Sequence, residues 1–529
     1  MNNKYLSWAI FSVAVIAIII PWVLIQSQYM ITGNISWLLI AAERLLNGQD
    51  LLQHIYETNP PLSILIYTPH VIFSKITGLP LAISSIYLTA IYIMIFTIAV
   101  SQIIKNFDFL ESGEKKALLL GFILATTLIT TLFFSDREHL IILTLIPFIL
   151  CQYAITNNIQ INKALLITVL TIGAIGILIK PHYGLLPTVF LISRMFKQRR
   201  LNIFFDPDFL TLSIATISYL TIIYIFFYDY ATVIFPDVWA LYASGTDPSI
   251  AFKSSQLIMV ASFSIYLFEL FSEDLKKQKK QFIMFLYLGS LLCFVPYFVQ
   301  MKGFYNHIIP AYAFLVCASM LSISFRVSKY LKSYKPLHFA IPFAAVFTSV
   351  LYTSPINNEF PKQYEVPNMP VASFLEKNCP KPCTFFVFHG DIEIFNPTAF
   401  TMGYTHGSRF PALWWLPKIL GEINLNTPDT VEKYKKLKSK YSTYLAEDLE
   451  YYKPSIILLE KDMPIGNVTA FNFLDFFEDN KEIKYIFNEL YEKDGMFEFN
   501  RAKYFRGTTL NNVYLLKYDI YRRKTNSSP

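Results

Sequence analysis

Four groups of charged and histidine side chains interrupt the long apolar stretches of this sequence. They are Glu57 with its polar neighbours, Asp136-Arg137-Glu138-His139, Lys180-Pro181-His182-Tyr183 and Lys302 through His307. Carboxylates placed beside Lys, Arg and His can bind a phosphate anion and transfer a proton. Charged groups close to a bilayer cost free energy, so each of these groups is a candidate for function.

Each group also has a purely structural explanation. Asp136 to His139 can be a helix cap with solvated charges. Lys180 and Lys302 can extend along apolar surface to reach water, and Glu57 can be a solvated loop residue. A shared chemical role therefore requires that the surrounding elements bring the four groups to one face.

The composition indicates a membrane protein. The 529 residues are 54% hydrophobic and 16% charged, with a mean hydropathy of +0.40. Soluble domains carry about 25% charged residues. The deficit falls in the first two thirds of the chain, where apolar runs of about 20 residues match the thickness of a bilayer core. The formal charge of +7 is not gathered in a basic stripe with interleaved aromatics, which argues against a nucleic-acid partner.

The apolar runs predict about eleven membrane spans. They cover residues 5–27, 80–103, 116–134, 139–156, 163–180, 183–197, 209–229, 254–272, 281–299, 306–324 and 337–353. The first run is too long for the apolar part of a signal peptide and no good cleavage site follows, so we interpret it as an uncleaved helix. The stretch 61–77 begins at Pro60-Pro61 and contains Pro69, which favours a juxtamembrane or re-entrant helix.

The placement of lysine and arginine predicts the orientation. With the N-terminus inside, the inside loops carry Lys105, Lys115, Lys116, Lys163, Lys197, Arg199, Arg200, Lys276, Lys277, Lys279, Lys280, Arg326, Lys329, Lys332 and Lys335. The outside loops carry few basic residues, and counting 61–77 as a full span would break this pattern. In this orientation all four polar groups lie at the outer face of the cytoplasmic (inner) membrane.

The composition changes near Ser354, where prolines cluster and a soluble pattern begins. Short β-rich runs at 384–389, 455–460 and 512–517 alternate with helical patterns near 370–377, 429–450 and 482–493. We therefore divide the chain into a membrane domain, 1–353, with a first outer loop, 28–79, and an extracytoplasmic α/β domain, 354–529. On the extracytoplasmic side a disulfide between Cys379 and Cys383 is favoured over a zinc site.

The loop after the first span has a distinctive order of residues. It reads Asn34-Ile35-Ser36-Trp37, then Ala42-Glu43-Arg44-Leu45-Leu46-Asn47-Gly48, then Tyr56-Glu57-Thr58-Asn59-Pro60-Pro61-Leu62. This order resembles the GT-C superfamily of membrane glycosyltransferases, which includes the lipid A aminoarabinose transferases and the protein O-mannosyltransferases. The Asp136-Arg137-Glu138-His139 turn resembles the family's second acidic position. The resemblance covers about the first 330 residues in layout.

The resemblance implies a polyprenyl-phosphate sugar donor and transfer at the outer face, usually with inversion. An acidic residue would act as base, and basic residues would hold the leaving phosphate. On this basis Glu57 and Asp136 are the predicted catalytic residues. The predicted substrate- and phosphate-binding residues are Asn34, Arg44, Tyr56, Asn59, Arg137, Glu138, His139, Lys180, His182, Lys302, Tyr305 and His307. One departure stands out: the family's first Asp position reads Gly33-Asn34, and an Asn cannot take a proton.

The sequence thus predicts a hexosyl- or pentosyltransferase with an envelope acceptor, which is a glycolipid such as lipopolysaccharide, a polysaccharide or a protein. Two other functions stay open. A transporter or flippase of lipid-linked sugars usually shows paired halves and charges near the bilayer midplane, and neither is visible here. The Asn34 departure leaves room for a non-catalytic scaffold. No cofactor is predicted, and no dense His/Asp cluster indicates a divalent metal.

Overall fold

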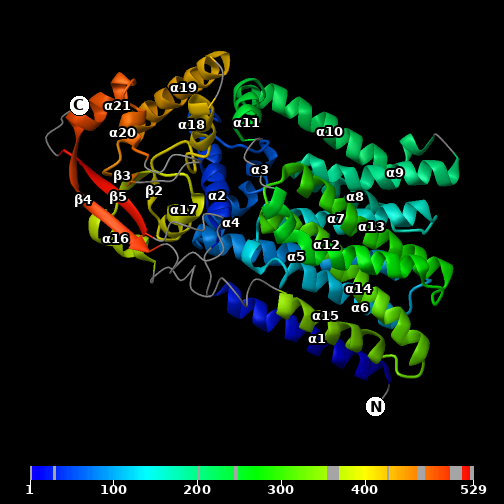
Figure 1. Cartoon of the computed structure of the whole chain (residues 1–529). Helices are drawn as coiled ribbons and strands as arrows, with labels where there is room; N and C mark the ends of the chain where they lie inside the picture. The colour runs from blue at the N-terminus through cyan, green and yellow to red at the C-terminus, as the bar shows by residue number, and fades with distance from the viewer. Residues whose placement is uncertain are drawn as a thin grey trace. The chain divides into compact units, whose positions relative to one another are not determined.

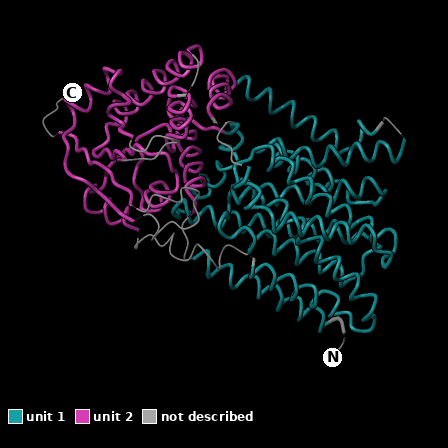
Figure 2. Tube along the Cα trace, viewed as in Figure 1, with its two compact units in different colours: residues 1–27, 59–226, 246–357 teal, residues 28–58, 227–245, 358–529 magenta. Residues whose placement is uncertain are grey.

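The computed structural model describes residues 3–27, 31–199, 202–242, 248–353, 369–425, 428–461, 471–500 and 515–524. The chain separates into two compact units, each assembled from several segments (Figure 2). Unit 1 comprises residues 1–27, 59–226 and 246–357, and unit 2 comprises residues 28–58, 227–245 and 358–529. The predicted first outer loop therefore divides at residue 58, and its first part groups with the C-terminal tail.

Unit 1 is built from helices (Figure 1). They are α1 (Asn3–Gln26), α3 (Leu62–Leu65), α4 (Thr68–Thr77), α5 (Leu81–Lys105), α6 (Ser112–Thr126), α7 (Arg137–Thr156), α8 (Lys163–Ile179), α9 (Leu185–Gln198), α10 (Pro207–Phe226), α12 (Pro248–Phe271), α13 (Lys277–Gln300), α14 (Ile309–Tyr330) and α15 (Leu337–Thr353). Single 3-10 turns, η1 (Thr131–Phe133), η2 (Pro181–Gly184), η3 (Asn202–Phe205) and η5 (Tyr305–Ile308), lie between some of them.

The protein is a multi-pass membrane protein. Among the described residues, seven helices are long and apolar enough to cross a bilayer: α1, α5, α7, α10, α12, α13 and η5 with α14. Helices α7 and α14 are buried along most of their length, whereas α10 exposes large apolar side chains such as Ile214, Ile217 and Leu220. Exposed side chains of this kind suit contact with lipid.

The other predicted spans form shorter helices, so the predicted count of eleven stays a prediction. The prediction of a continuous span over 116–134 is wrong, because α6 ends at Thr126. The hydroxyls of Thr126 and Thr127 donate to the carbonyls of Phe122 and Ile123, which competes with regular backbone pairing. The stretch 61–77 forms two short helices, α3 and α4, with Pro69 at the start of α4.

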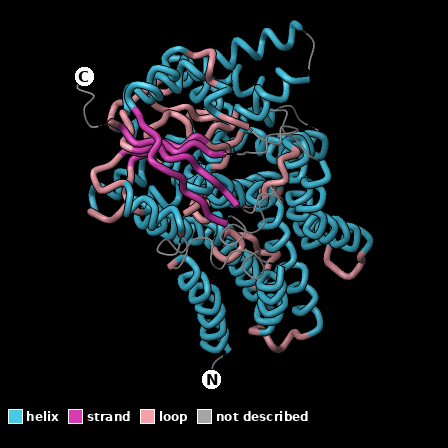
Figure 3. The backbone as a smooth tube through the Cα atoms, turned by 60° about the vertical axis from the view of Figure 1, so that its left-hand side comes forward, coloured by secondary structure: helices cyan, strands magenta, loops and turns pink. Residues whose placement is uncertain are grey.

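Unit 2 combines helices with one sheet (Figure 3). Its helices are α2 (Gly33–Leu46), α11 (Phe235–Tyr242), α16 (Pro370–Asn378), α17 (Ile392–Thr401), α18 (Leu416–Leu425), α19 (Pro428–Tyr452), α20 (Phe473–Phe476) and α21 (Lys481–Tyr485). The described strands are β1 (Thr384–Phe388), β2 (Thr405–His406), β3 (Ile456–Lys461), β4 (Tyr491–Asn500) and β5 (Leu515–Arg523), in the order β2-β1-β3-β5-β4.

The sheet is mixed, and its centre is apolar on both faces. Strand β1 pairs in parallel with β2 and β3, while β5 pairs antiparallel with β3 and β4. The predicted strands at 384–389 and 455–460 are confirmed as β1 and β3, whose side chains are almost all buried. The predicted helix over 482–493 is confirmed as α21 and a π-helical turn to Leu490, and it is wrong from Tyr491, where strand β4 begins. Residues 512–514 of the third predicted strand lie outside the described residues.

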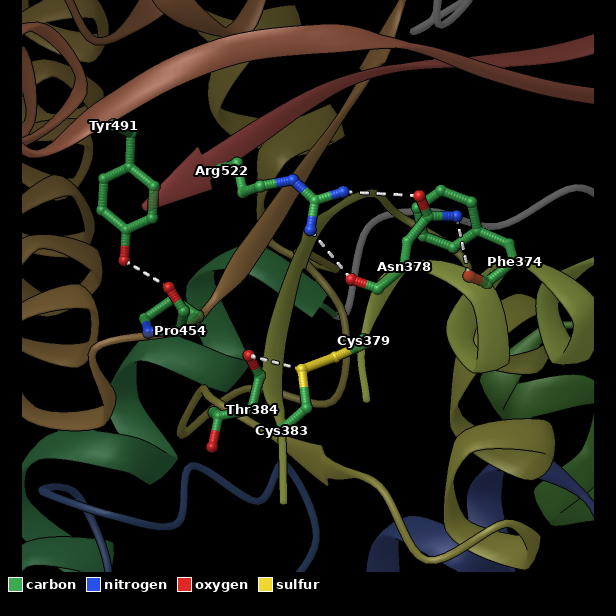
Figure 4. Close-up of a disulfide and its surroundings, with 8 residues drawn as sticks. All are labelled: Phe374, Asn378, Cys379, Cys383, Thr384, Pro454, Tyr491 and Arg522. Atoms are coloured by element: carbon green, nitrogen blue, oxygen red, sulfur yellow. Dashed lines mark hydrogen bonds between the residues drawn. A yellow bond between two sulfur atoms is a disulfide. The ribbon is translucent and has the colours of Figure 1, made fainter. Parts of the chain in front are cut away.

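Cys379 and Cys383 form a disulfide between the end of α16 and the start of β1 (Figure 4). The guanidinium of Arg522, on β5, donates to the backbone carbonyl of Asn378 at 3.0 Å and to its side-chain oxygen at 3.4 Å. The disulfide and these hydrogen bonds tie helix α16 to the sheet. The other cysteines, Cys151, Cys293 and Cys317, are buried as free thiols.

Candidate functional site

Helix α7 begins at a turn that presents Asp136 inside unit 1. Asp136 caps the helix, and its Oδ1 accepts a hydrogen bond of 2.6 Å from the backbone N–H of Arg137. The preceding Ser135 has a φ of +70°, which a residue other than glycine adopts only with support. Tyr67 donates to the Ser135 carbonyl at 2.7 Å, and the Ser135 N–H donates to His139 Nδ1 at 3.0 Å. The turn is therefore held from both sides.

Close packing of α8 on α7 brings Lys180 to the same place. Glycines line the contact: a Cβ at Gly173 would lie 2.7 Å from the Phe148 side chain. A Cβ at Gly176 would lie 1.9 Å from Thr144 Oγ1. Only glycine allows this approach. Lys180 follows the last residue of α8, and Pro181 begins the turn η2 beyond it.

Glu138, Lys180 and His307 meet in the interior of unit 1, and we call them the buried triad. The Lys180 ammonium donates to Glu138 Oε1. Lys180 Nζ lies 3.2 Å from His307 Nε2, and His307 Nε2 lies 3.4 Å from Glu138 Oε1. The three side chains are 0% to 10% exposed. They come from α7, the end of α8 and the turn η5, so three separate parts of the chain converge here.

Asp136 and Arg137 immediately precede Glu138 in the chain, and both are also buried. Asn306 Nδ2 donates to Asp136 Oδ2 at 3.2 Å, which links η5 to the start of α7. Arg137 Nε lies 3.8 Å from Asp136 Oδ1. With Glu138 and Lys180, two carboxylates thus share a small volume with two cations. Buried charges are stable only when they are compensated in this way.

Among the described residues, two polar atoms of the triad lack a hydrogen-bond partner. Within the part of the chain that the structure describes, Glu138 Oε2 and His307 Nδ1 are buried and have no hydrogen-bond partner. Most buried polar atoms in folded proteins are paired, so each such atom calls for an explanation. A substrate hydroxyl would donate to Glu138 Oε2, and a phosphate oxygen would accept from His307 Nδ1–H.

The remaining predicted residues of unit 1 are His139, His182, Lys302, Tyr305 and Asn59. His182 Nε2 is 3.3 Å from Gln300 Nε2, and the Tyr183 hydroxyl donates to the His307 carbonyl at 3.4 Å. His139 holds the Ser135 turn, as described above. Lys302 and Asn59 are half-buried. The Tyr305 ring stacks on Phe133 with 6.1 Å between ring centroids.

Unit 2 holds Glu57 in an ordered loop. Trp37 Nε1 on α2 donates to Glu57 Oε2 at 2.8 Å, and Glu57 is 4% exposed. The Tyr56 hydroxyl donates to Asp237 Oδ2 at 2.9 Å and lies 2.7 Å from the Tyr441 hydroxyl. Burial raises the pKa of Tyr56 above its usual value. Asn34 is half-buried near the start of α2.

Arg44 has a structural role in unit 2. Its guanidinium donates to the backbone carbonyls of His54 at 2.8 Å, Ser408 at 2.7 Å and His406 at 2.7 Å. Burial lowers the pKa of Arg44. These bonds use three of the five guanidinium donors, and Arg44 is only 7% exposed, so the geometry does not favour the predicted substrate-binding role. Instead Arg44 ties the loop before Glu57 to the segment around β2.

The predicted residues therefore form two groups. Unit 1 brings together Asp136, Arg137, Glu138, Lys180 and His307, and unit 2 contains Asn34, Arg44, Tyr56 and Glu57. The convergence of Glu57 with Asp136 stays a prediction. Among the described residues, no group of three or more His, Cys, Asp or Glu side chains has the arrangement of a metal site.

Some residues of these networks lie outside the predicted set. Asn306 belongs to the fourth polar group, and its amide was a plausible partner for a buried carboxylate. Gln300 is the last residue of α13, where an amide after an apolar run is a weak signal. Asp237 gives no sequence signal, because only the fold brings it to Tyr56 and Tyr441.

The chain matches no protein-family model and no curated protein sequence. Among solved structures it is similar to the cryo-EM structure of the arabinofuranosyltransferase AftD from Mycobacteria, with a TM-score of 0.44 and 12% sequence identity. The similarity covers 99% of this chain and 42% of that chain, so this chain spans less than half the length of that protein. A TM-score of 0.44 does not establish a shared fold.

Proposed function

We propose that this chain is a GT-C-type membrane glycosyltransferase that moves a sugar from a polyprenyl-phosphate donor to an envelope acceptor. The observation that carries the proposal is the buried triad with Asp136 and Arg137, because it gathers bases and cations at one point of a membrane protein. The sugar is a hexose or a pentose, and the acceptor is a glycolipid, a polysaccharide or a protein.

The cations suit the leaving group of this reaction. When the glycosidic bond to phosphate breaks, the electron pair stays on the phosphate oxygen and leaves a polyprenyl phosphate anion. The departure of this phosphate leaving group needs nearby positive charge rather than a strong acid. Lys180 and Arg137 carry that charge, and the N-terminus of α7 adds backbone N–H groups that favour an anion.

The carboxylates suit the attacking group. As the bond from the acceptor oxygen to the sugar carbon forms, the hydroxyl proton passes to a carboxylate. Asp136 is oriented for this step by hydrogen bonds from the Arg137 N–H and the Asn306 amide. Glu57, fixed by Trp37, is the second candidate base. A single displacement of this kind inverts the configuration at the sugar carbon.

Our proposal includes a location at the outer face of the cytoplasmic membrane, with the tail extracytoplasmic. The Cys379–Cys383 disulfide supports this location, because disulfides persist in oxidising compartments. The lysine- and arginine-rich loops on the opposite side support it as well.

The test is sugar transfer by the Asp136→Asn and Glu57→Gln variants, each checked for insertion in the membrane at the level of the unchanged chain. We expect each variant to lose about 10²–10⁴-fold in rate, the usual contribution of a positioned general base. Asp274→Asn is the matched control, since Asp274 is 52% exposed and pairs with Lys329 elsewhere in unit 1. Full transfer by both variants would refute the assignment of the bases.

A further inference from the structure

Unit 2 contains a polar cleft of about 620 Å³ that neither catalytic group uses. The loop Leu52–His54, the segment at Arg409 and helix α19 form its walls. We call it the Arg409 cleft, and its main lining side chains are His54, Arg409, Tyr444, Glu447, Asp448 and Tyr451. All of them belong to unit 2.

Hydrogen bonds and an ion pair hold Arg409 at the floor of the Arg409 cleft. Arg409 Nε donates to Asp448 Oδ1 at 2.7 Å, and its terminal nitrogens donate to Glu447 Oε2 at 2.7 Å and to the Leu52 carbonyl at 3.0 Å. Its guanidinium also lies over the Tyr444 ring at 4.7 Å. Arg409 and Asp448 are 4% and 1% exposed. Because these contacts fix the planar guanidinium of Arg409, it holds the carboxylates of Glu447 and Asp448 in place for a ligand.

Aromatic rings form the wall of the cleft. Tyr451 is 58% exposed, although it is a large aromatic side chain. The His54 ring packs against it with 5.0 Å between centroids. His54 Nδ1 is buried and, within the described residues, has no hydrogen-bond partner. The cleft therefore combines an open ring face with an unpaired polar atom, and a neutral polar ligand would engage both.

The charge of the cleft disfavours anionic ligands. Glu447, Asp448 and Glu450 bring three carboxylates to the cleft, against the single guanidinium of Arg409. Like charges disfavour a phosphate or a uronic acid in such a place. A sugar with free hydroxyls donates hydrogen bonds to carboxylates, and an amino sugar adds a favourable charge. The CH-bearing face of a pyranose ring is apolar and packs on an exposed tyrosine, which offers a rigid amphipathic surface.

We propose that the Arg409 cleft is a glycan-binding site that takes a neutral or amine-bearing sugar. In the proposed glycosyltransferase this sugar belongs to the acceptor, a point that rests on the proposed function. His54 precedes Glu57 by three positions in the same loop, and Arg409 also accepts the backbone N–H of Tyr56 through its carbonyl at 2.8 Å. A glycan in the cleft would thus bind the loop that carries one candidate base.

The test is direct binding by isothermal titration calorimetry with the full chain in detergent and no donor present. The probes are mannohexaose, a chitosan hexamer and hexagalacturonate, which are neutral, cationic and anionic. We expect mannohexaose or the chitosan hexamer to bind at least tenfold more tightly than hexagalacturonate. Binding by none of the three, or the tightest binding by hexagalacturonate, would overturn the proposal.

Two variants place the binding in the cleft. Tyr451→Ala removes the exposed ring and is expected to weaken binding at least tenfold. The matched control is Tyr485→Ala, because Tyr485 is also 58% exposed but lies on α21, outside the cleft. Glu447→Gln keeps the shape of the side chain but removes its charge. We expect it to weaken the binding of the chitosan hexamer more than the binding of mannohexaose. Unchanged affinity in both Tyr451→Ala and Glu447→Gln would overturn the assignment.

The outcome separates this site from the transferase proposal. If Asp136→Asn and Glu57→Gln retain sugar transfer while Tyr451→Ala loses glycan binding, the transferase assignment fails and the cleft stands as a glycan-binding site. If those two variants lose transfer while no hexasaccharide binds, the cleft proposal fails and the transferase assignment stands.

Discussion

Removing the charge of Lys180 separates a structural role of the buried triad from a functional one. In Lys180→Met the side chain keeps a similar length, but Glu138 loses the ammonium that donates to its Oε1. Both partners are nearly inaccessible to water. Breaking a buried ion pair by removing one partner costs about 3–5 kcal/mol. Because whole proteins are stable by about 5–15 kcal/mol, the variant should be measurably destabilised.

The double variant Lys180→Met/Glu138→Gln removes the uncompensated charge. We expect it to recover most of the lost stability, since a buried pair replaced as a whole is often nearly neutral. If the triad binds the donor phosphate, the rate of sugar transfer by the double variant does not recover with its stability. Loss of one preorganised electrostatic group costs about 10²–10³-fold in kcat, so the double variant should be stable and still slow.

The assay compares thermal unfolding of the purified chain with sugar transfer in membranes at matched protein level. A matched control is the pair Lys279–Glu114, which is also largely buried in unit 1 but lies apart from the triad. Lys279→Met should lose stability. Lys279→Met/Glu114→Gln should regain stability and transfer sugar at the rate of the unchanged chain. Our reasoning is refuted if Lys180→Met/Glu138→Gln recovers transfer together with stability, because the triad would then be structural.

Three further predictions concern the supports of the two candidate groups. Gly176→Ala places a Cβ against Thr144 and should cost about 1–3 kcal/mol in thermal unfolding, with Thr144→Ala restoring part of the loss. Trp37→Phe removes the N–H that holds Glu57 and should lower transfer while leaving the chain folded by circular dichroism. Burial lowers the pKa of His406 to about 3, so the unfolded chain binds its proton first as the pH falls below about 6.5. Between pH 7.5 and 5.5 this linkage should lower the free energy of unfolding by about 1.4 kcal/mol, measured by hydrogen exchange of the β1 amides. In His406→Phe this pH-dependent loss should be absent.

Much of the fold follows from local patterns in the sequence. The apolar runs predict helices such as α5 and α7 because a bilayer requires about 20 apolar residues in one helix. Strands β1 and β3 are predicted because buried central strands are continuous apolar runs. Strand β4 is not predictable in this way, because its side chains are mostly exposed and only its pairing with β5 defines it.

The site is predictable in its charged members and not in its partners. Asp136, Glu138 and Lys180 stand out because charge inside an apolar sequence is costly. The pairing of Lys180 with Glu138 depends on the glycine contact between α7 and α8, which has no signature that distinguishes it from ordinary helix composition. Arg44 is the opposite case. Its charge suggests a ligand, but the fold uses it to bind three backbone carbonyls.

The most direct test of the central claim is mass spectrometry of the envelope glycans from a strain that lacks this chain. The account predicts one glycan that has lost a single hexose or pentose, restored by the unchanged chain and not by Asp136→Asn expressed at the same level. Envelope glycans that are identical with and without the chain, or full restoration by Asp136→Asn, would contradict it.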